Sequence, residues 1–210
     1  MTISLRLVDS YAKISNDINI AIAKYINTQF NKNKNTVLNQ IRRSIPIWLL
    51  ESPEIQSLSQ EGIEGSLNAQ FGITRGTSLE VIDQITNAVS KSIYVEIKPV
   101  TKKLTDGGIY FYIQPSDFKN LLQLPAGFIL RDTYSLHWLQ WLLLEGTKTV
   151  VFGYTYTPDN TGVSGGGTMT FGGLWRVPPQ FAGNANDNFI TRVLLGRDRE
   201  LAVILQGMFK

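Results

Sequence analysis

A short glycine-rich motif is the first place in this chain where chemistry could be expected. Gly162-Val163-Ser164-Gly165-Gly166 matches the G-x-S-x-G pattern in which hydrolases hold a nucleophilic serine. That chemistry needs a strand before the serine, a helix after it and a histidine later in the chain. Here a strand is predicted after the motif, and the single histidine, His137, precedes it. The favoured interpretation is a flexible loop, and a serine hydrolase using Ser164 is kept as an alternative.

The other sequence features that could hold a metal or a cofactor are incomplete. His137 stands in an apolar stretch with no second ligand at metal-binding spacing. The chain has no cysteine, which excludes disulfides and thiolate-bound metals. The run Gly165, Gly166 and Gly167 lacks the lysine and the following helix of a phosphate-binding loop. We expect a protein that is not an enzyme and that needs no metal and no cofactor.

Basic residues are concentrated near the N-terminus, where no acid stands between Asp17 and Glu51. The formal net charge of the chain is only +3, which does not by itself indicate a nucleic-acid partner. A solvated helix face is the simpler interpretation, and contact with an acidic protein surface or with passing DNA is the functional one. A nucleic-acid-binding module that uses residues 24–43 is therefore a further alternative. The residues of this basic contact face are Lys24, Lys32, Lys34, Arg42 and Arg43.

Tryptophans mark a second candidate surface. Trp138 and Trp141 are three residues apart on a predicted helix, so they share a face, and Trp175 precedes Arg176 near the end of a predicted strand. Tryptophan and arginine are enriched where protein interfaces carry most of their energy. A place in the core is the alternative for both helical tryptophans. Because that helix is apolar on every side, we expect part of its cover to come from a neighbouring subunit.

The elements that would position these residues begin with helices over residues 1–90. Asp9 or Ser10 can cap the first helix. The polar run at residues 31–35 predicts a loop, and Pro46 predicts a bend or an end in the second helix. A further helix starts at Ser52-Pro53, and Thr77-x-x-Glu80 matches the capping box of another. The first helix has its apolar residues at three- and four-residue spacing, which makes one stripe: Tyr11, Ile14, Ile18, Ala21, Ile22 and Tyr25.

From residue 92 the pattern changes to strands. Residues 93–97 alternate in polarity, and residues 109–113 form the returning strand after an Asp-Gly-Gly turn. Two more strands are predicted at 149–156 and 169–177, where Gly172 and Gly173 favour a bulge. A buried helix is predicted at 136–145, and a closing helix follows Asn186 or Asp187. The order indicates an α+β fold in a single domain, residues 1–210. Its helical N-terminal part (1–90) precedes an antiparallel sheet of about four strands with an inserted apolar helix and a closing C-terminal helix (92–210).

Hydropathy gives no sign of a membrane partner. No apolar stretch approaches the ~20 residues that a bilayer-spanning helix needs. The first seven residues also lack the basic start and the apolar run of a signal peptide. We expect a soluble protein that is made in a cytoplasm.

Three motifs follow one another in the C-terminal half. Leu136-His-Trp-Leu-Gln-Trp-Leu-Leu-Leu-Glu-Gly-Thr precedes a strand and the glycine-rich loop, Gly172-Gly-Leu-Trp-Arg-Val-Pro-Pro-Gln-Phe-Ala-Gly comes next, and Asp187-Asn-Phe-Ile-Thr-Arg opens the closing helix. As an ordered set, over roughly residues 92–205, they resemble the tail-completion and neck proteins of tailed bacteriophages, the family that joins head to tail. Those proteins also place an aromatic-rich helix ending in Glu-Gly-Thr before a hairpin, and a proline-containing turn before a closing helix.

The resemblance implies a non-catalytic subunit of a ring between the portal and the tail tube, commonly with six-fold or twelve-fold symmetry. The implied partners are further copies of the chain and other neck, portal or tail-tube proteins, with DNA only as the genome that passes through the channel. The implied location is the neck of the virion, assembled in the host cytoplasm. The resemblance does not separate a connector from a tail terminator, and the helical segment 8–90 is longer than in the small members of the family.

In such a ring we expect the loop at residues 159–167 to be an assembly loop, mobile in the free protein and ordered by a neighbour. Its central residues are Ser164, Gly165, Gly166 and Gly167. Deleting these four residues is then expected to leave folding intact and to impair joining.

Overall fold

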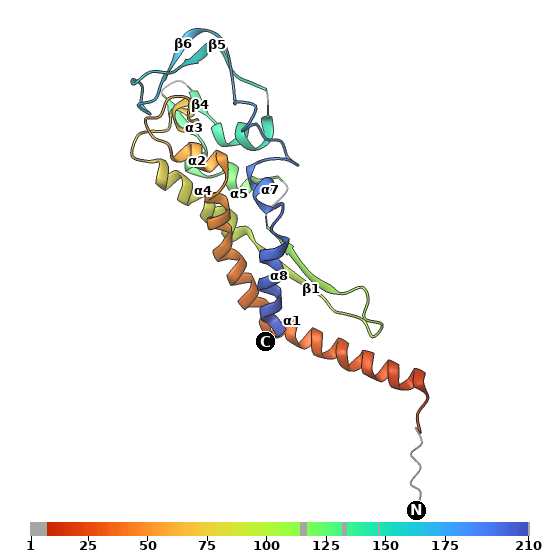
Figure 1. Cartoon of the computed structure of the whole chain (residues 1–210). Helices are drawn as coiled ribbons and strands as arrows, with labels where there is room; N and C mark the ends of the chain where they lie inside the picture. The colour runs from red at the N-terminus through yellow and green to blue at the C-terminus, as the bar shows by residue number, and fades with distance from the viewer. Residues whose placement is uncertain (1–7, 114–116, 132–133, 147, 210) are drawn as a thin grey trace, which may run out of the picture.

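The computed structural model describes residues 8–113, 117–131, 134–146 and 148–209. Figure 1 shows an elongated molecule in which one long helix, α1 (Tyr11–Leu50), runs from a projecting N-terminal end into a body that holds the other elements. Ser10 caps α1, because its side chain accepts a hydrogen bond from the Lys13 N–H.

Helix α1 continues through both places where an interruption was predicted. The loop predicted at residues 31–35 is wrong: Asn31 donates its side-chain amide to the Asn27 carbonyl, and Asn33 donates to the Met208 carbonyl at 2.7 Å, so the polar run is bonded as a helix. Pro46 does not end the helix either. It leaves the Arg42 carbonyl without its helical donor, and the Ser90 hydroxyl donates to that carbonyl at 2.7 Å instead.

Three shorter helices follow α1: α2 (Pro53–Ser59) and α4 (Ser78–Ser92) pack against α1, and α3 (Leu67–Phe71) packs against α2. The predicted start of α2 is confirmed, with Ser52 as the cap and Pro53 in the first turn. The capping box predicted at Thr77 is wrong, because Thr77 makes no side-chain cap. The Glu61 carboxylate replaces it by accepting from the Ser78 hydroxyl, the Gly76 N–H and the Ser78 N–H, and these bonds hold the pKa of Glu61 below its ordinary value.

The strands form hairpins and not one sheet. Within the described residues, β1 (Tyr94–Lys98) pairs with β2 (Gly108–Tyr112), β3 (Ile129–Arg131) with β4 (Tyr134–Leu136), and β5 (Thr149–Thr157) with β6 (Thr168–Arg176), all antiparallel. The α+β class is confirmed, and the single four-stranded sheet is wrong. Short helical segments separate the first two hairpins, namely α5 (Lys119–Leu122) and the 3-10 turn Pro125–Gly127. Each hairpin is therefore its own two-stranded sheet among the described residues, and β1 packs against α1.

The inserted apolar helix is shorter than predicted. Leu136 ends strand β4, and the helix runs over α6 (Trp138–Gln140) and a π-helical turn, η2 (Trp141–Glu145). Within this segment the side chains of Trp138, Leu139, Leu142 and Leu143 are fully buried in the core of the same chain. The cover expected from a neighbouring subunit is therefore supplied internally.

The closing helix is two helices, α7 (Phe189–Leu194) and α8 (Asp198–Gln206), followed by the 3-10 turn Gly207–Phe209. Gly196 separates them with a φ of +81°, a left-handed conformation that glycine adopts without strain. The cap of α7 is Asn188, one or two residues after the positions predicted, and Thr191 completes a reciprocal capping box with it. Over the part of the chain described here, no helix is both long and apolar enough to cross a membrane.

Candidate assembly site

Two of the predicted interface tryptophans belong to the core. The Phe71 ring lies between them, with ring centroids 5.1 Å from Trp138 and 5.7 Å from Trp175. Both indole N–H groups have acceptors, the Ala126 carbonyl for Trp138 and the Gln70 amide oxygen for Trp175. Because both rings are buried and satisfied within one chain, the prediction that Trp138 and Trp175 face another subunit is wrong.

The three C-terminal motifs lie against one another in the structure. Glycines allow their backbones to approach closely, and ion pairs hold the third motif in place. A Cβ atom added to Gly183 would lie 2.5 Å from the Leu142 carbonyl oxygen, so only glycine lets the second motif approach the first this closely. Gly146, the next-to-last residue of the first motif, has a φ of +52°, and its own added Cβ would lie 3.1 Å from the Gly183 carbonyl oxygen. The threonine that follows Gly146 in the first motif lies outside the described residues.

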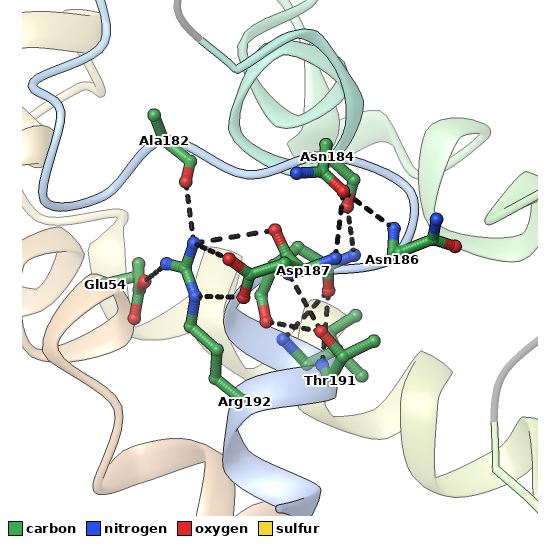
Figure 2. A network of polar contacts seen from close by, with 9 residues as sticks. Glu54, Ala182, Asn184, Asn186, Asp187, Thr191 and Arg192 are labelled. Carbon is green, nitrogen blue, oxygen red and sulfur yellow. Dashed lines mark hydrogen bonds and ion pairs between the residues drawn. The ribbon is translucent and has the colours of Figure 1, made fainter.

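The third motif is fastened by an arginine network (Figure 2). Arg192 on α7 donates to Glu54 on α2 at 2.9 Å, to the Asp187 carboxylate at 2.7 Å and to the Ala182 carbonyl at 2.8 Å. The Glu54 side chain is only 3% exposed, so the guanidinium supplies the counter-charge that a buried carboxylate requires. The hydrogen bond from Arg192 holds the pKa of Asp187 below its ordinary value. The motifs that carry the family resemblance thus close the fold.

The glycine-rich loop is packed and not free. Ser164 is fully buried, and Gly166 and Gly167 are buried with it. An added Cβ on Gly166 would lie 2.8 Å from the Ala69 side chain, and one on Gly167 would lie 2.4 Å from the Tyr156 ring. The prediction of a mobile assembly loop is therefore wrong, and deleting its four central residues is expected to disturb folding.

Tyr156 and Asp159 hold this loop in place. The Tyr156 hydroxyl donates to the Gly166 carbonyl at 2.6 Å and accepts from the Gly65 N–H at 2.8 Å, so it ties the loop to the segment before α3. The Asp159 carboxylate accepts from the hydroxyl and the N–H of Thr161 and from the Thr168 hydroxyl. These bonds hold the pKa of Asp159 below its ordinary value, and the bond from the Thr161 hydroxyl has the largest effect.

The geometry around Ser164 does not form a hydrolase site. Its hydroxyl lies 3.5 Å from the Ala69 carbonyl and accepts from the Gly166 N–H at 3.4 Å, which are structural bonds within the loop. No base among the described residues hydrogen-bonds this hydroxyl, which nucleophilic catalysis would require. His137 lies outside the helix, exposed, with its Nε2 atom 3.1 Å from the Ser135 hydroxyl. The described residues bring no carboxylate onto that imidazole to complete a triad.

The predicted basic contact face is divided. Lys24, Lys32 and Arg43 are exposed, whereas Arg42 turns inward and donates to the Ile93 carbonyl at 2.9 Å. On a helix that turns by about 100° per residue, Lys32 and Lys34 point roughly 200° apart. The five residues therefore cannot make one surface for a nucleic acid.

An uncovered apolar surface lies on the β5–β6 hairpin, which sequence reasoning did not single out. Its register pairs Phe152 with Leu174 and Tyr154 with Phe171 across the strands, and these pairs lie on one face because β-strand side chains alternate. Phe171 is 89% exposed and Phe152 is 74% exposed. The opposite face carries Thr155 opposite Thr170 and Thr157 opposite Thr168 near the loop, and Val151 opposite the buried Trp175 at the other end. We call the set Phe152, Tyr154, Met169, Phe171 and Leu174 the hairpin face.

A bulge gives the hairpin face its shape. The pairing skips Gly153 on β5 and both Gly172 and Gly173 on β6, so the bulge predicted at the two β6 glycines is confirmed. All three glycines have positive φ, which other residues rarely adopt. The bulge keeps Leu174 and Phe171 on the same side of the sheet although they are three residues apart.

A cleft of about 870 Å³ lies beneath this hairpin, between it, α3 and the β3–β4 hairpin. Its walls include Ile129, Leu136, Val151 and the half-buried ring of Trp141, and three residues of the hairpin face border it as well, Phe152, Tyr154 and Met169. Trp141 is thus the one predicted interface tryptophan that borders an open surface, while Arg176 is exposed at the end of β6. The cleft is lined mainly by apolar side chains and is open to solvent, which suits a protein partner more than a charged small molecule.

Comparison of the chain with protein-family models, with curated proteins and with solved structures finds no match. No group of three or more metal-binding side chains gathers among the described residues. The fold defines this chain as an α+β protein built on one long helix, and its function has to be inferred from the surfaces described above.

Proposed function

We propose that this chain is a non-catalytic structural subunit of the neck of a tailed bacteriophage, and that copies of it form a ring between the portal and the tail tube. The observation that carries this function is the hairpin face. Five large side chains on one side of a two-stranded sheet are 37–89% exposed in the single chain, and an apolar surface of this kind normally marks a site of protein association.

The resemblance of the C-terminal motifs to neck proteins supports the same function. Those motifs pack on one another and leave much of the β5–β6 hairpin exposed, so their packing supplies a base for an association surface. The tertiary arrangement favours the hairpin, and not the tryptophan-bearing helix, as the place where neighbouring subunits meet.

A neighbour in a ring is the partner that this surface fits best. A ring contact is heterologous, so the hairpin face of one subunit would pack on a different surface of the next, and the rotation would close after a fixed number of copies. We expect six or twelve copies, with the genome passing through the centre.

Native mass spectrometry of the purified protein tests the ring. The expected result is a closed oligomer of six or twelve chains, which Phe171→Asp abolishes while the circular dichroism spectrum and the melting temperature are retained. Thr155→Asp places the same charge on the threonine side of the hairpin and is the matched control, expected to leave the oligomer intact. A ring that survives Phe171→Asp would show that the hairpin face is not the contact.

Electron microscopy of phage particles made without this gene tests the joining role. Filled heads and finished tails lying unattached are the expected result. Intact infectious particles would contradict a function in the neck, whatever the oligomeric state of the purified protein.

A further inference from the structure

A second uncovered apolar surface lies at the other end of the molecule, on the part of α1 that projects from the body (Figure 1). The exposed fraction is 88% for Tyr11, 53% for Ile18 and 52% for Tyr25. Ile22 is 40% exposed, and Ile14 between them is partly exposed. We call the set Tyr11, Ile14, Ile18, Ile22 and Tyr25 the arm stripe.

The arm stripe is distinct from the face of α1 that the chain itself covers. The β1–β2 hairpin packs on the opposite side, where Ala23 is buried and Asn27 exchanges two hydrogen bonds with Val100, at 3.0 and 2.8 Å. With about 100° of rotation per residue, the five stripe residues fall within a sector of roughly 80°. The next positions in that sector are Gln29, Lys32 and Thr36, so the apolar stripe ends where the helix enters the body.

The arm stripe is self-complementary. It reads Tyr-Ile-Ile-Ile-Tyr with steps of three, four, four and three residues, and both the residue types and the steps are the same in either direction. A two-fold contact requires this kind of symmetry, because residue i meets residue j and residue j meets residue i. Steps of three and four residues are also the spacing of helix-on-helix packing.

We propose that the arm stripe pairs antiparallel with the arm stripe of a second copy of this chain, about a two-fold axis at Ile18. Tyr11 then packs on Tyr25 of the partner subunit, Ile14 on Ile22 of the partner subunit, and Ile18 on Ile18 of the partner subunit. The paired segment is about 21 Å long, from 14 residue steps of 1.5 Å.

Charge favours the antiparallel orientation. A parallel pair would place each charged residue of the arm level with its own copy, and like charges side by side are destabilising. In the antiparallel pair Lys13 is level with Ala23 of the partner subunit, Asp17 with Asn19 of the partner subunit, and Lys24 with Ala12 of the partner subunit. None of these charged residues then meets a like charge at its own level.

The size of the arm stripe sets the strength of the pairing. Five side chains are far fewer than the roughly 20–30 residues a side of a standard interface. The dimer is therefore expected to be weak and to depend on protein concentration. This two-fold contact is independent of the hairpin face, so arm dimers are expected even where the ring does not form.

Single cysteines in this cysteine-free chain test the pairing and its direction. Under mild oxidation Ile18→Cys alone is expected to form a disulfide-linked dimer. Tyr11→Cys and Tyr25→Cys are each expected to remain largely unlinked alone and to form a mixed dimer when combined. Linked dimers of Tyr11→Cys alone would overturn the antiparallel orientation, and the absence of linkage in all three variants would overturn the pairing.

Analytical ultracentrifugation of the wild-type chain measures the strength of dimerisation without introduced cysteines. Ile18→Asp is expected to weaken dimerisation at least ten-fold, while Asn16→Asp, which places the same charge on the other side of the helix, is expected to leave it unchanged. To separate this contact from the ring, both changes are also made in the Phe171→Asp background. Monomers at every concentration in that background, or dimers that persist in Ile18→Asp, would overturn arm pairing without bearing on the neck function.

Discussion

Aromatic side chains stand in two contrasting settings in this molecule, the cluster around Phe71 and the hairpin face. In the cluster, Trp138 and Trp175 are buried, and each indole N–H has an acceptor within the chain. On the hairpin, Tyr154 and Phe171 make an edge-on contact with ring centroids 6.0 Å apart, yet both rings remain open to solvent. Aromatic content alone therefore does not locate an interface. What distinguishes the two settings is whether the aromatic rings are covered within the chain.

Truncation in the two settings should have opposite consequences, and this is the largest effect that we expect. Trp138→Ala removes a fully buried ring and should lower the free energy of unfolding by about 3–5 kcal/mol. Phe171→Ala should change it by less than about 0.5 kcal/mol while weakening the oligomer. Urea unfolding of both variants measures the difference. Equal losses of stability would mean that the hairpin face is covered within the free chain.

The arginine network should behave as part of the core setting. Arg192→Met leaves the buried Glu54 carboxylate without its counter-charge, and we expect a loss of about 3 kcal/mol in the free energy of unfolding. For a chain of this size that corresponds to a fall of roughly 10 °C in melting temperature. Arg176→Met, at an exposed position on the hairpin, is the matched control and should melt as the wild type does. A wild-type melting temperature for Arg192→Met would show that the network does not fasten α7 to α2.

Substitutions in the glycine-rich loop should lower stability as core substitutions do, and not be neutral as they are on exposed surfaces. Gly166→Ala adds a methyl group 2.8 Å from the Ala69 side chain, and overpacking of this kind should cost about 2 kcal/mol of unfolding free energy. Gly207→Ala adds the same methyl group where no atom lies within 4 Å, so it should be nearly neutral. Thermal unfolding compares the two, and a neutral Gly166→Ala would restore the mobile loop that the sequence predicted.

The smallest effect concerns pH. The folded-state pKa of Asp159 lies below its ordinary value, so its hydrogen bonds contribute stability above the unfolded-state pKa of about 3.9, and this contribution is lost as pH falls through the folded-state pKa. Asp159→Asn should therefore be less stable than the wild type near neutral pH, and the gap should narrow in acid. Urea midpoints from pH 6 to pH 3 measure it. A gap that widens in acid would contradict the role of the carboxylate in closing the loop.

Sequence reasoning predicted local elements well wherever periodicity or turn chemistry acted alone. The Ser52-Pro53 start of α2, both strands of the last hairpin and the bulge at Gly172 and Gly173 were all predicted from nearest neighbours. Two of the errors involved a partner distant in the chain. Met208 accepts the amide of Asn33 where a loop was predicted, and Glu61 replaces Thr77 as the cap of α4.

The candidate sites show the same contrast between what local sequence patterns predict and what tertiary contacts decide. Residue types gave Trp138, Trp175 and Ser164 as surface candidates, and tertiary packing buried all three. The basic residues of α1 were found, but their angular positions on a continuous helix separate them. The hairpin face was missed because its strand pairing, and not its composition, brings Phe152, Tyr154, Phe171 and Leu174 together.

By itself the sequence determined the α+β class, the start of α2, both strands of the last hairpin and an apolar stripe on the first helix, because these follow from spacing along one element. Only the tertiary structure decided which apolar surfaces are core and which are open. That outcome depends on contacts between residues such as Glu54 and Arg192, which are far apart in the chain and whose pairing no local pattern encodes. Burial is a property of the whole packing, and so is the surface that remains for a partner.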